Sequence, residues 1–511
     1  MAEPLETVAT PVRPRRRVVQ NTVFSALTKA QGAILSYITT LILLHALSVE
    51  GYGLYSVLFV GVVANLSLLL RFGIANVLTR FIPEYYSQGN FRVIARLFSM
   101  ANLIQTASAA LLAVIAWIFA PQLATLIRFP GSENVLRIFA VGAAAYLLTE
   151  NFRILFGGVF QQRVILIVNF IYAVIRLAAL YIATRTADPL FSVMIAESAL
   201  YVFLLAAYYI AYRLLVRPRI EEHPDHEIPP PWRRFTRYAG LYYLNELGLT
   251  LINQATDLFI VSGLLGDLAV GLYGLANRIL QLATQVLPNK VFGDVIEPLF
   301  FSEYGEARKQ EAQFGFNMFL KVTLLTALPI GIWISLMGRP LIVELFDARY
   351  ADAAMILTVS GLILPMIAMR MPLGLILQNA ERPDLLLIAK LTGVLKIVLG
   401  LMLVRQWGVM AMVWVTFSTT LAELIVNFSF VATKLHVRTD FVGLLRLGIN
   451  SLIAAALFYP LRPFFAGRIG VIISIPLFAA LYLGINLLHK TFRAEEREFI
   501  NSKMPYPLWK F

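Results

Sequence analysis

The sequence predicts an all-α polytopic membrane protein of about fourteen transmembrane helices, with two six-helix lobes related by a pseudo-two-fold axis plus two C-terminal helices. The first observation behind this fold class is composition. Of the 511 residues, 59% are hydrophobic and 14% are charged, and the mean hydropathy is +0.73. A soluble protein of this size would have about a quarter of its residues charged, so the water-soluble class is excluded.

The second observation is the length of the apolar segments, since a helix needs roughly 20 apolar residues to cross a bilayer. Breaks at proline, glycine and charge clusters delimit these segments. They lie at 22–46, 53–77, 97–120, 134–158, 164–184, 189–212, 237–262, 270–296, 314–338, 352–379, 384–404, 408–432, 446–461 and 469–489. The first is longer than the apolar core of a cleaved signal peptide, so we expect it to remain as a helix.

The third observation is an internal repeat, in which the second half matches the first at an offset of 217 to 220 residues. Six helices in each half make both halves run in the same direction, so the pseudo-two-fold axis lies along the membrane normal and a transport site is expected between the halves. Four matches occur in order: Gly53-Leu54-Tyr55 with Gly271-Leu272-Tyr273, Glu84-Tyr85 with Glu303-Tyr304, Arg153, Gly157 and Gln161 with Arg370, Gly374 and Gln378, and Arg176 and Arg185 with Lys396 and Arg405.

The distribution of charge sets the orientation. The chain has 43 Lys and Arg against 30 Asp and Glu, a net charge of +13. With the N-terminus placed inside, the cytoplasmic segments hold 25 Lys and Arg, counting Arg237 and Arg446 at the starts of their spans, and the outer loops hold 7. The positive-inside rule therefore places both termini in the cytoplasm and accounts for the basic balance without nucleic acid as a partner.

The domain organisation follows from these segments. We expect a cytoplasmic basic N-terminus at 1–20, an N-lobe at 21–213, a cytoplasmic proline-rich linker at 214–236, a C-lobe at 237–433, two further spans within 434–489 and a cytoplasmic tail at 490–511. The acids and histidines at 221–227 permit a metal site or, more simply, a solvated acidic loop. The chain has no cysteine, which removes disulfides and thiolate metal sites. No metal and no cofactor is expected.

Polar side chains form stripes at helical spacing on three of the predicted spans, and ionisable groups inside a bilayer usually face a cavity or a partner. Lys29 and Ser36 lie on the stripe of the first span. The seventh span has Glu246, Thr250, Asn253 and Asp257, and the eighth has Arg278, Gln281, Gln285 and Asn289. Cations outnumber acids within and near the spans. This excess suits an anionic cargo, because a guanidinium can hold a diphosphate through two parallel hydrogen bonds.

The sequence resembles the polysaccharide-exporter branch of the multidrug/oligosaccharidyl-lipid/polysaccharide (MOP) flippase superfamily, which includes O-antigen and exopolysaccharide flippases. The resemblance covers roughly residues 20 to 490. It is found in Asn21 to Ala30, Leu47 to Tyr55, Phe72-Gly73-Ile74, Thr79 to Tyr85, Asp257 to Ile260, and Gly266 to Tyr273.

The resemblance implies two lobes around a hydrated cavity, which move an undecaprenyl-diphosphate-linked oligosaccharide from the inner to the outer leaflet of the cell inner membrane by alternating access. It also implies polymerase and chain-length proteins of a polysaccharide pathway as partners, besides membrane lipids. It places a cationic cleft on Lys29, Arg71 and Arg278. Ser36 and Asn253 are further candidates for substrate binding, and Glu246 and Asp257 for ion coupling.

Each candidate has a structural alternative. Arg71 lies near the inner end of its helix, where its side chain can reach the interface. Arg278 can instead form an ion pair with Asp257 or Glu246. The cations that do not belong to the cleft are expected to hold helices together; these are Arg153, Arg176, Lys321, Arg370 and Lys396.

Three other functions remain open: a lipid II flippase, a cation-coupled drug exporter of the same superfamily, and a membrane polysaccharide polymerase or glycosyltransferase. The enzyme is disfavoured because the longest outer loop, 121–133, holds one acid and one arginine. The drug exporter has no need of a cationic cleft. No GxxxxGK[ST] segment is present, so ATP is not the direct driver through a Walker loop.

Overall fold

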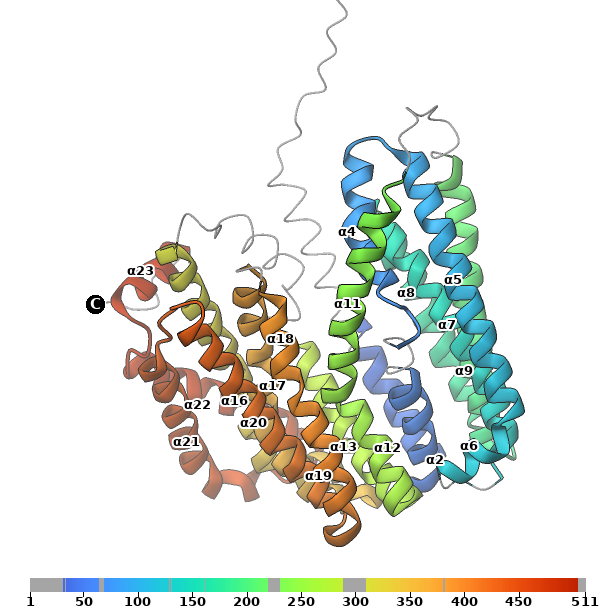
Figure 1. The fold of residues 1–511 in the computed structure, drawn as a ribbon. Coiled ribbons are helices and arrows are strands. Elements are labelled where there is room, and N and C mark those ends of the chain that lie inside the picture. The colour runs from blue at the N-terminus through green and yellow to red at the C-terminus, as the bar shows by residue number, and fades with distance from the viewer. Residues whose placement is uncertain are drawn as a thin grey trace, which may run out of the picture.

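The structure is a computed structural model that describes residues 31–32, 34–63, 69–127, 129, 131–159, 161–218, 230–287, 309–379 and 382–503. Throughout these residues the regular elements are helices, as the sequence predicted (Figure 1). Lys29, the repeat match at Glu303-Tyr304 and the acidic loop 221–227 lie outside the described residues.

Helices of the first half form one group, at the right of Figure 1. Hydrophobic runs with few charged residues give the long members, and glycine or proline marks several of their ends. In chain order they are Ile34–Ala46, α2 (Val49–Tyr55), η1 (Ser56–Val62), α4 (Ile74–Ser87), α5 (Phe91–Ile118), α6 (Ala120–Leu126), α7 (Glu133–Gly158), α8 (Gln162–Ala183) and α9 (Pro189–Leu215).

Helices of the second half form the other group, followed by the last two long helices and a short one. In chain order they are α11 (Trp232–Ile252), α12 (Gln254–Leu265), α13 (Asp267–Gln285), α16 (Lys309–Leu345), η2 (Ala348–Tyr350), α17 (Ala353–Asn379), α18 (Pro383–Lys390), α19 (Thr392–Trp407), α20 (Val409–Thr433), α21 (Phe441–Phe458), η3 (Tyr459–Phe465), α22 (Gly467–Leu488) and α23 (Ala494–Lys503).

Within the described residues, ten helices are long and apolar enough to cross a membrane, and the α11–α12 pair makes eleven if it counts as one bent span. All fourteen predicted segments coincide with helices over at least part of their length. The number found is smaller than fourteen because the predicted segments 22–46, 53–77 and 270–296 run partly outside the described residues. The chain is a multi-pass membrane protein.

The two groups meet where α2 packs on α13, at the end predicted to face outward (Figure 1). The repeated glycines lie at this crossing. A Cβ on Gly53 would lie 2.7 Å from the carbonyl oxygen of Asp267, and a Cβ on Gly271 would overlap the carbonyl oxygen of Val49. Only glycine allows the two backbones to approach this closely, so the repeat marks the contact between the halves.

A second contact joins α4 to α11. Arg234 donates to both carboxylate oxygens of Glu84, at 2.8 and 3.2 Å. The rings of Phe81 and Phe235 pack with centroids 4.8 Å apart. Asn76 donates to Glu246 Oε1 at 2.6 Å. An ion pair, ring packing and a hydrogen bond therefore fix the first helix of the second half against the first half.

Candidate functional site

A polar cavity of about 370 Å³ lies among the helices of the first half and reaches α13 of the second. Its lining is rich in tyrosine and arginine, a combination that offers ring faces, hydroxyl groups and positive charge. The arginines are Arg153 on α7, Arg176 on α8 and Arg278 on α13. The tyrosines are Tyr52, Tyr55, Tyr146, Tyr172, Tyr201 and Tyr208.

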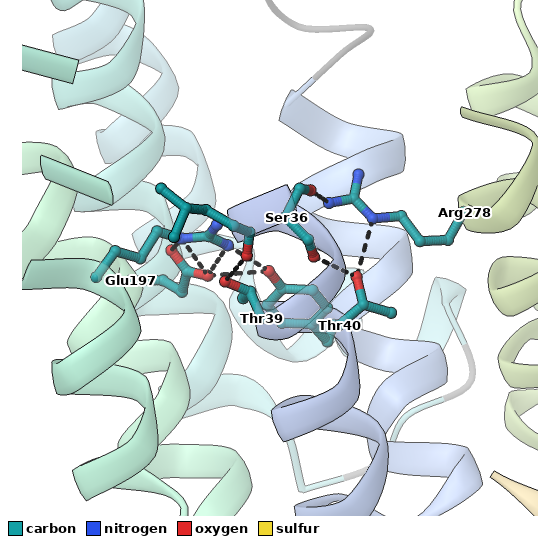
Figure 2. Close-up of polar contacts among 8 residues, drawn as sticks. Ser36, Thr39, Thr40, Glu197 and Arg278 are labelled. Atoms are coloured by element: carbon teal, nitrogen blue, oxygen red, sulfur yellow. Dashed lines mark hydrogen bonds and ion pairs between the residues drawn. The ribbon is translucent and has the colours of Figure 1, made fainter. Parts of the chain in front are cut away.

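Arg278 enters the cavity from the second half and meets the helix Ile34–Ala46 (Figure 2). Its guanidinium donates to Ser36 Oγ, to Thr40 Oγ1 at 3.3 Å and to Gln281 Oε1 at 3.2 Å. All three acceptors are neutral. Within the described part of the chain, neither Asp257 nor Glu246 forms an ion pair with Arg278, so the structural alternative to a binding role is not observed there.

Arg176 differs because a carboxylate compensates its charge. Its Nε lies 3.1 and 3.0 Å from the two oxygens of Glu197, and its Nη2 lies 2.5 Å from Oε1. Tyr55 donates its hydroxyl to Glu197 at 2.9 Å and accepts from Arg176 at 3.0 Å. Glu197 is fully buried, whereas the Arg176 side chain is 21% exposed. Arg176 is thus paired with Glu197 of α9, as expected of a structural cation, and it also lines the cavity.

Arg71 and Arg153 share Glu150. The Nη2 of Arg153 lies 2.6 Å from Glu150 Oε2, and that of Arg71 lies 3.6 Å from the same atom. Arg153 and Glu150 line the cavity, but Arg71 is not among the lining residues. Arg71 therefore lies behind the cavity wall, where it shares Glu150 with Arg153.

The other sequence-predicted residues fall in two further places. Asp257, fully buried on α12, lies 2.5 Å from Lys396 Nζ and accepts from Tyr273 at 2.8 Å and from Thr416 at 2.9 Å. Asn253 lies at the break between α11 and α12, and its carbonyl oxygen accepts from Lys396 at 2.9 Å. Glu246 lies in the α4–α11 contact, with its Oε2 buried and unpaired. These three do not line the polar cavity.

A larger apolar cavity, of about 690 Å³, lies on the other side of the same two helices. Ile34 and Tyr37 of the first span face it, as do Ile279, Leu282 and Ala283 of α13. Helices α16 and α22 complete it, with Trp333 and Phe478 among its lining. The helix Ile34–Ala46 and α13 therefore separate a polar, cationic chamber from an apolar one.

Sequence reasoning missed the tyrosine lining and the place of Arg153 and Arg176 on the cavity wall. The available signal was the frequency of tyrosine inside the first-half spans together with the repeat of both arginines. This signal was not decisive, because tyrosine side chains also pack helices against one another.

Comparisons with known proteins identify the family and the fold of this chain. A family model described as polysaccharide biosynthesis protein matches residues 18–302, more than half of the chain. A comparison with curated protein sequences gives no match.

Among solved structures, the chain is similar to the lipid II flippase MurJ in an inward closed conformation. The TM-score is 0.66 at 16% identity, over 91% of this chain and 98% of that one. It is similar to an inward-facing MATE multidrug resistance transporter of the MOP superfamily, at 0.62 and 12%, over 79% and 96%. It is also similar to the MATE multidrug transporter DinF-BH, at 0.59 and 17%, over 84% and 97%.

At these sequence identities, the solved structures establish the fold of the chain. The family model establishes the protein family to which the chain belongs. The inward-facing MATE transporter is a member of the MOP superfamily, in agreement with the resemblance of the sequence. The chain is a member of the polysaccharide biosynthesis protein family and has the fold of the multidrug/oligosaccharidyl-lipid/polysaccharide flippase superfamily.

Proposed function

We propose that this protein is a flippase that moves an undecaprenyl-diphosphate-linked oligosaccharide from the inner to the outer leaflet of the cell inner membrane, for cell-surface polysaccharide biosynthesis. In this proposal both termini are cytoplasmic. Membrane lipids and the polymerase and chain-length proteins of the pathway are its partners. It transports its cargo by alternating access of the two lobes and performs no chemistry on it.

The observation that carries the proposal is Arg278, whose contacts in the described chain are all with neutral oxygens. A partly buried guanidinium without a carboxylate attracts an anion strongly, because the surrounding dielectric constant is low. Arg278 stands at the boundary between the tyrosine-lined polar cavity and the other lobe. A diphosphate bound at Arg278 leaves the polar cavity for the sugar that is attached to it.

The two cavities fit an amphiphilic cargo. A lipid-linked oligosaccharide has a charged headgroup, a polar sugar and an apolar chain, and the helix Ile34–Ala46 and α13 separate a polar chamber from an apolar one. Lys29 lies in the same predicted span as Ser36, seven residues before it, so it belongs in the proposal as a second cation for the diphosphate, with Ser36 orienting Arg278. Asn253 fits less well, because its carbonyl serves Lys396.

The membrane potential can drive the transport. Moving about two negative charges outward across an interior-negative membrane releases roughly 2.3 kcal/mol per charge per 100 mV. Ion coupling through Glu246 is a further proposal, since its buried Oε2 is unpaired. Asp257 is a weaker candidate because Lys396 already neutralises it.

The test measures flipping of fluorescent undecaprenyl-diphosphate oligosaccharide in vesicles that contain the purified protein. We expect Arg278→Ala and charge reversal at Lys29 each to slow flipping by about tenfold to a hundredfold. The reason is that hydrogen bonds to charged groups contribute about 1.5–3 kcal/mol. Arg405→Ala, which changes an exposed arginine at the end of α19, is the matched control and should leave the rate unchanged.

Equal rates in all four proteins would reject the cationic site. A wild-type protein that flips lipid II but not other lipid-linked sugars would instead show a peptidoglycan function, and one that moves drug cations alone would show an exporter. In cells, charge reversal at Lys29 should abolish surface polysaccharide while its lipid-linked precursor stays on the inner leaflet.

A further inference from the structure

Two of the buried ionic clusters, one in each half, occupy equivalent positions of the repeat. The first cluster consists of Thr39, Tyr55, Arg176 and Glu197, and the second of Asp257, Tyr273, Lys396 and Thr416. Each member of the first lies 218 to 220 residues before its counterpart, which is the offset of the repeat. The correspondence includes both the cation and the tyrosine.

The acid and the threonine have exchanged places between the clusters. In the first half the carboxylate is Glu197 on α9, and the equivalent position on α20 is Thr416. In the second half the carboxylate is Asp257 on α12, and the equivalent position in the first span is Thr39. Each cluster therefore keeps one cation, one carboxylate and one tyrosine, although the acid comes from a different helix.

Both clusters hold the helices that cross between the halves. Tyr55 and Tyr273 each come two residues after a crossing glycine, Gly53 on α2 and Gly271 on α13. Tyr55 donates to Glu197, and Tyr273 donates to Asp257 at 2.8 Å. Each tyrosine thus connects the α2–α13 crossing with the interior of its own half.

Only the first cluster is open to the cavity. Thr39, Tyr55 and Arg176 line it, and the Arg176 side chain is 21% exposed. Lys396 is 2% exposed and Asp257 is fully buried, and neither lines the polar cavity. A cargo in the cavity can therefore reach one cluster and not its equivalent.

We propose that the first cluster is a latch that responds to the cargo. The diphosphate competes with Glu197 for Arg176, the hydrogen bonds of Tyr55 are released, and α2 loosens at its crossing with α13, while the second cluster keeps α13 in place. This inference rests on the proposed function and adds to it the route by which an occupied cavity opens the outer contact.

The test uses the absence of cysteine from the chain, which allows a single labelled pair. Spin labels at Glu50→Cys and Leu268→Cys, both exposed in the first turns of α2 and α13, report the distance across the crossing. The labelled protein is studied in vesicles with and without undecaprenyl diphosphate. We expect this lipid to lengthen the distance between the labels.

Tyr55→Phe and Tyr273→Phe are matched variants, because they remove the same hydroxyl from equivalent clusters. We expect Tyr55→Phe to show the longer distance before lipid is added and to change little afterwards. Because the hydroxyl holds the closed crossing, its loss should raise the ratio of open to closed protein about fivefold, the equivalent of one buried hydrogen bond. Tyr273→Phe should keep the response of the parent. Glu197→Gln, which weakens the same latch without changing its shape, should behave like Tyr55→Phe.

A Tyr55→Phe protein that responds as the parent does, or a Tyr273→Phe protein that loses the response equally, would overturn the latch. If the parent flips the lipid-linked oligosaccharide but its label distance does not change, the latch fails while the flippase function stands. If the parent flips no such lipid, both fail together. Elution as a single monodisperse species confirms that each variant is folded.

Discussion

At single residues, the cations of this protein differ in whether a carboxylate compensates their charge. Lys321 on α16 is fully buried, yet Asp440 and Glu496 lie 2.5 and 2.6 Å from its Nζ. Arg493 adds a contact of 2.9 Å to Asp440. Two cations and two acids make a neutral cluster that fastens α23 and the start of α21 to α16. Lys321 is thus paired in the way expected of a structural cation, in contrast to Arg278.

This cluster predicts how the C-terminal region responds to substitution at Lys321. Burial would raise the pKa of the Asp440 carboxyl, but hydrogen bonds from Lys321 and Arg493 outweigh it and lower the pKa to about 2. A lowered pKa stabilises the fold above the ordinary value near 4, and this contribution is lost only as the pH falls towards 2. At pH 7 it is fully present.

We therefore expect Lys321→Met to destabilise the protein at pH 7 by about 3–5 kcal/mol, because it leaves two buried carboxylates short of a cation. Thermal unfolding of the detergent-solubilised protein measures the change. Lys434→Met, at the exposed end of α20, is the control and should have little effect. An unchanged unfolding temperature in Lys321→Met would show that the cluster does not hold α23.

At the scale of elements, the seventh predicted span shows what sequence patterns reveal and what they miss. The apolar run predicted one helix at 237–262, but the structure has α11 and α12 at an angle of 43° with Asn253 extended between them. Neither glycine nor proline marks this break. The carbonyl oxygen of Asn253 accepts a hydrogen bond from Lys396, which lies 143 residues further along the chain. Sequence periodicity depends only on residues close together in the chain, so it does not reveal such a distant partner.

The same limit applies to the candidate site. Polar spacing identified the face of the first span that carries Ser36, and the charge pattern identified Arg278. The pairing of Arg176 with Glu197 was not predictable, because it depends on which helices become neighbours. The sequence therefore indicates which spans are polar, whereas the choice between a free and a compensated cation requires the packing.

Lys396 supports the broken span, and this gives an element-scale prediction. We expect Lys396→Met to destabilise the protein by about 3–5 kcal/mol, since it leaves Asp257 charged and buried and the Asn253 carbonyl without its donor. The double variant Lys396→Met with Asp257→Asn removes both charges and should recover part of this loss. Thermal unfolding of the single and double variants measures both changes in stability. Equal stability of Lys396→Met and the wild type would show that Lys396 does not support the broken span.

At the scale of the whole molecule, the repeat is symmetric in its framework and asymmetric in its polar cavity. The repeated glycines meet at the α2–α13 crossing, and equivalent clusters lie in the two halves. The polar cavity, however, is formed mainly by the first half, and the second contributes Arg278. Such asymmetry suits a cargo that has no two-fold symmetry of its own. In the proposed function, one half holds the cargo, and the other supplies a charge at the boundary and a partner for the crossing.

The crossing itself is the remaining test of how the halves work together. In Gly271→Ala the new Cβ would overlap the Val49 carbonyl oxygen, a backbone atom that no side-chain rotation can move. We expect the crossing to widen, with a loss of about 1–3 kcal/mol in stability, as found for overpacked sites. The distance between labels at Glu50→Cys and Leu268→Cys should lengthen without lipid. Gly448→Ala on α21, where a Cβ meets open space, is the matched control and should change neither quantity. If Gly271→Ala left the label distance as in the parent, the outer contact would not depend on the repeated glycines.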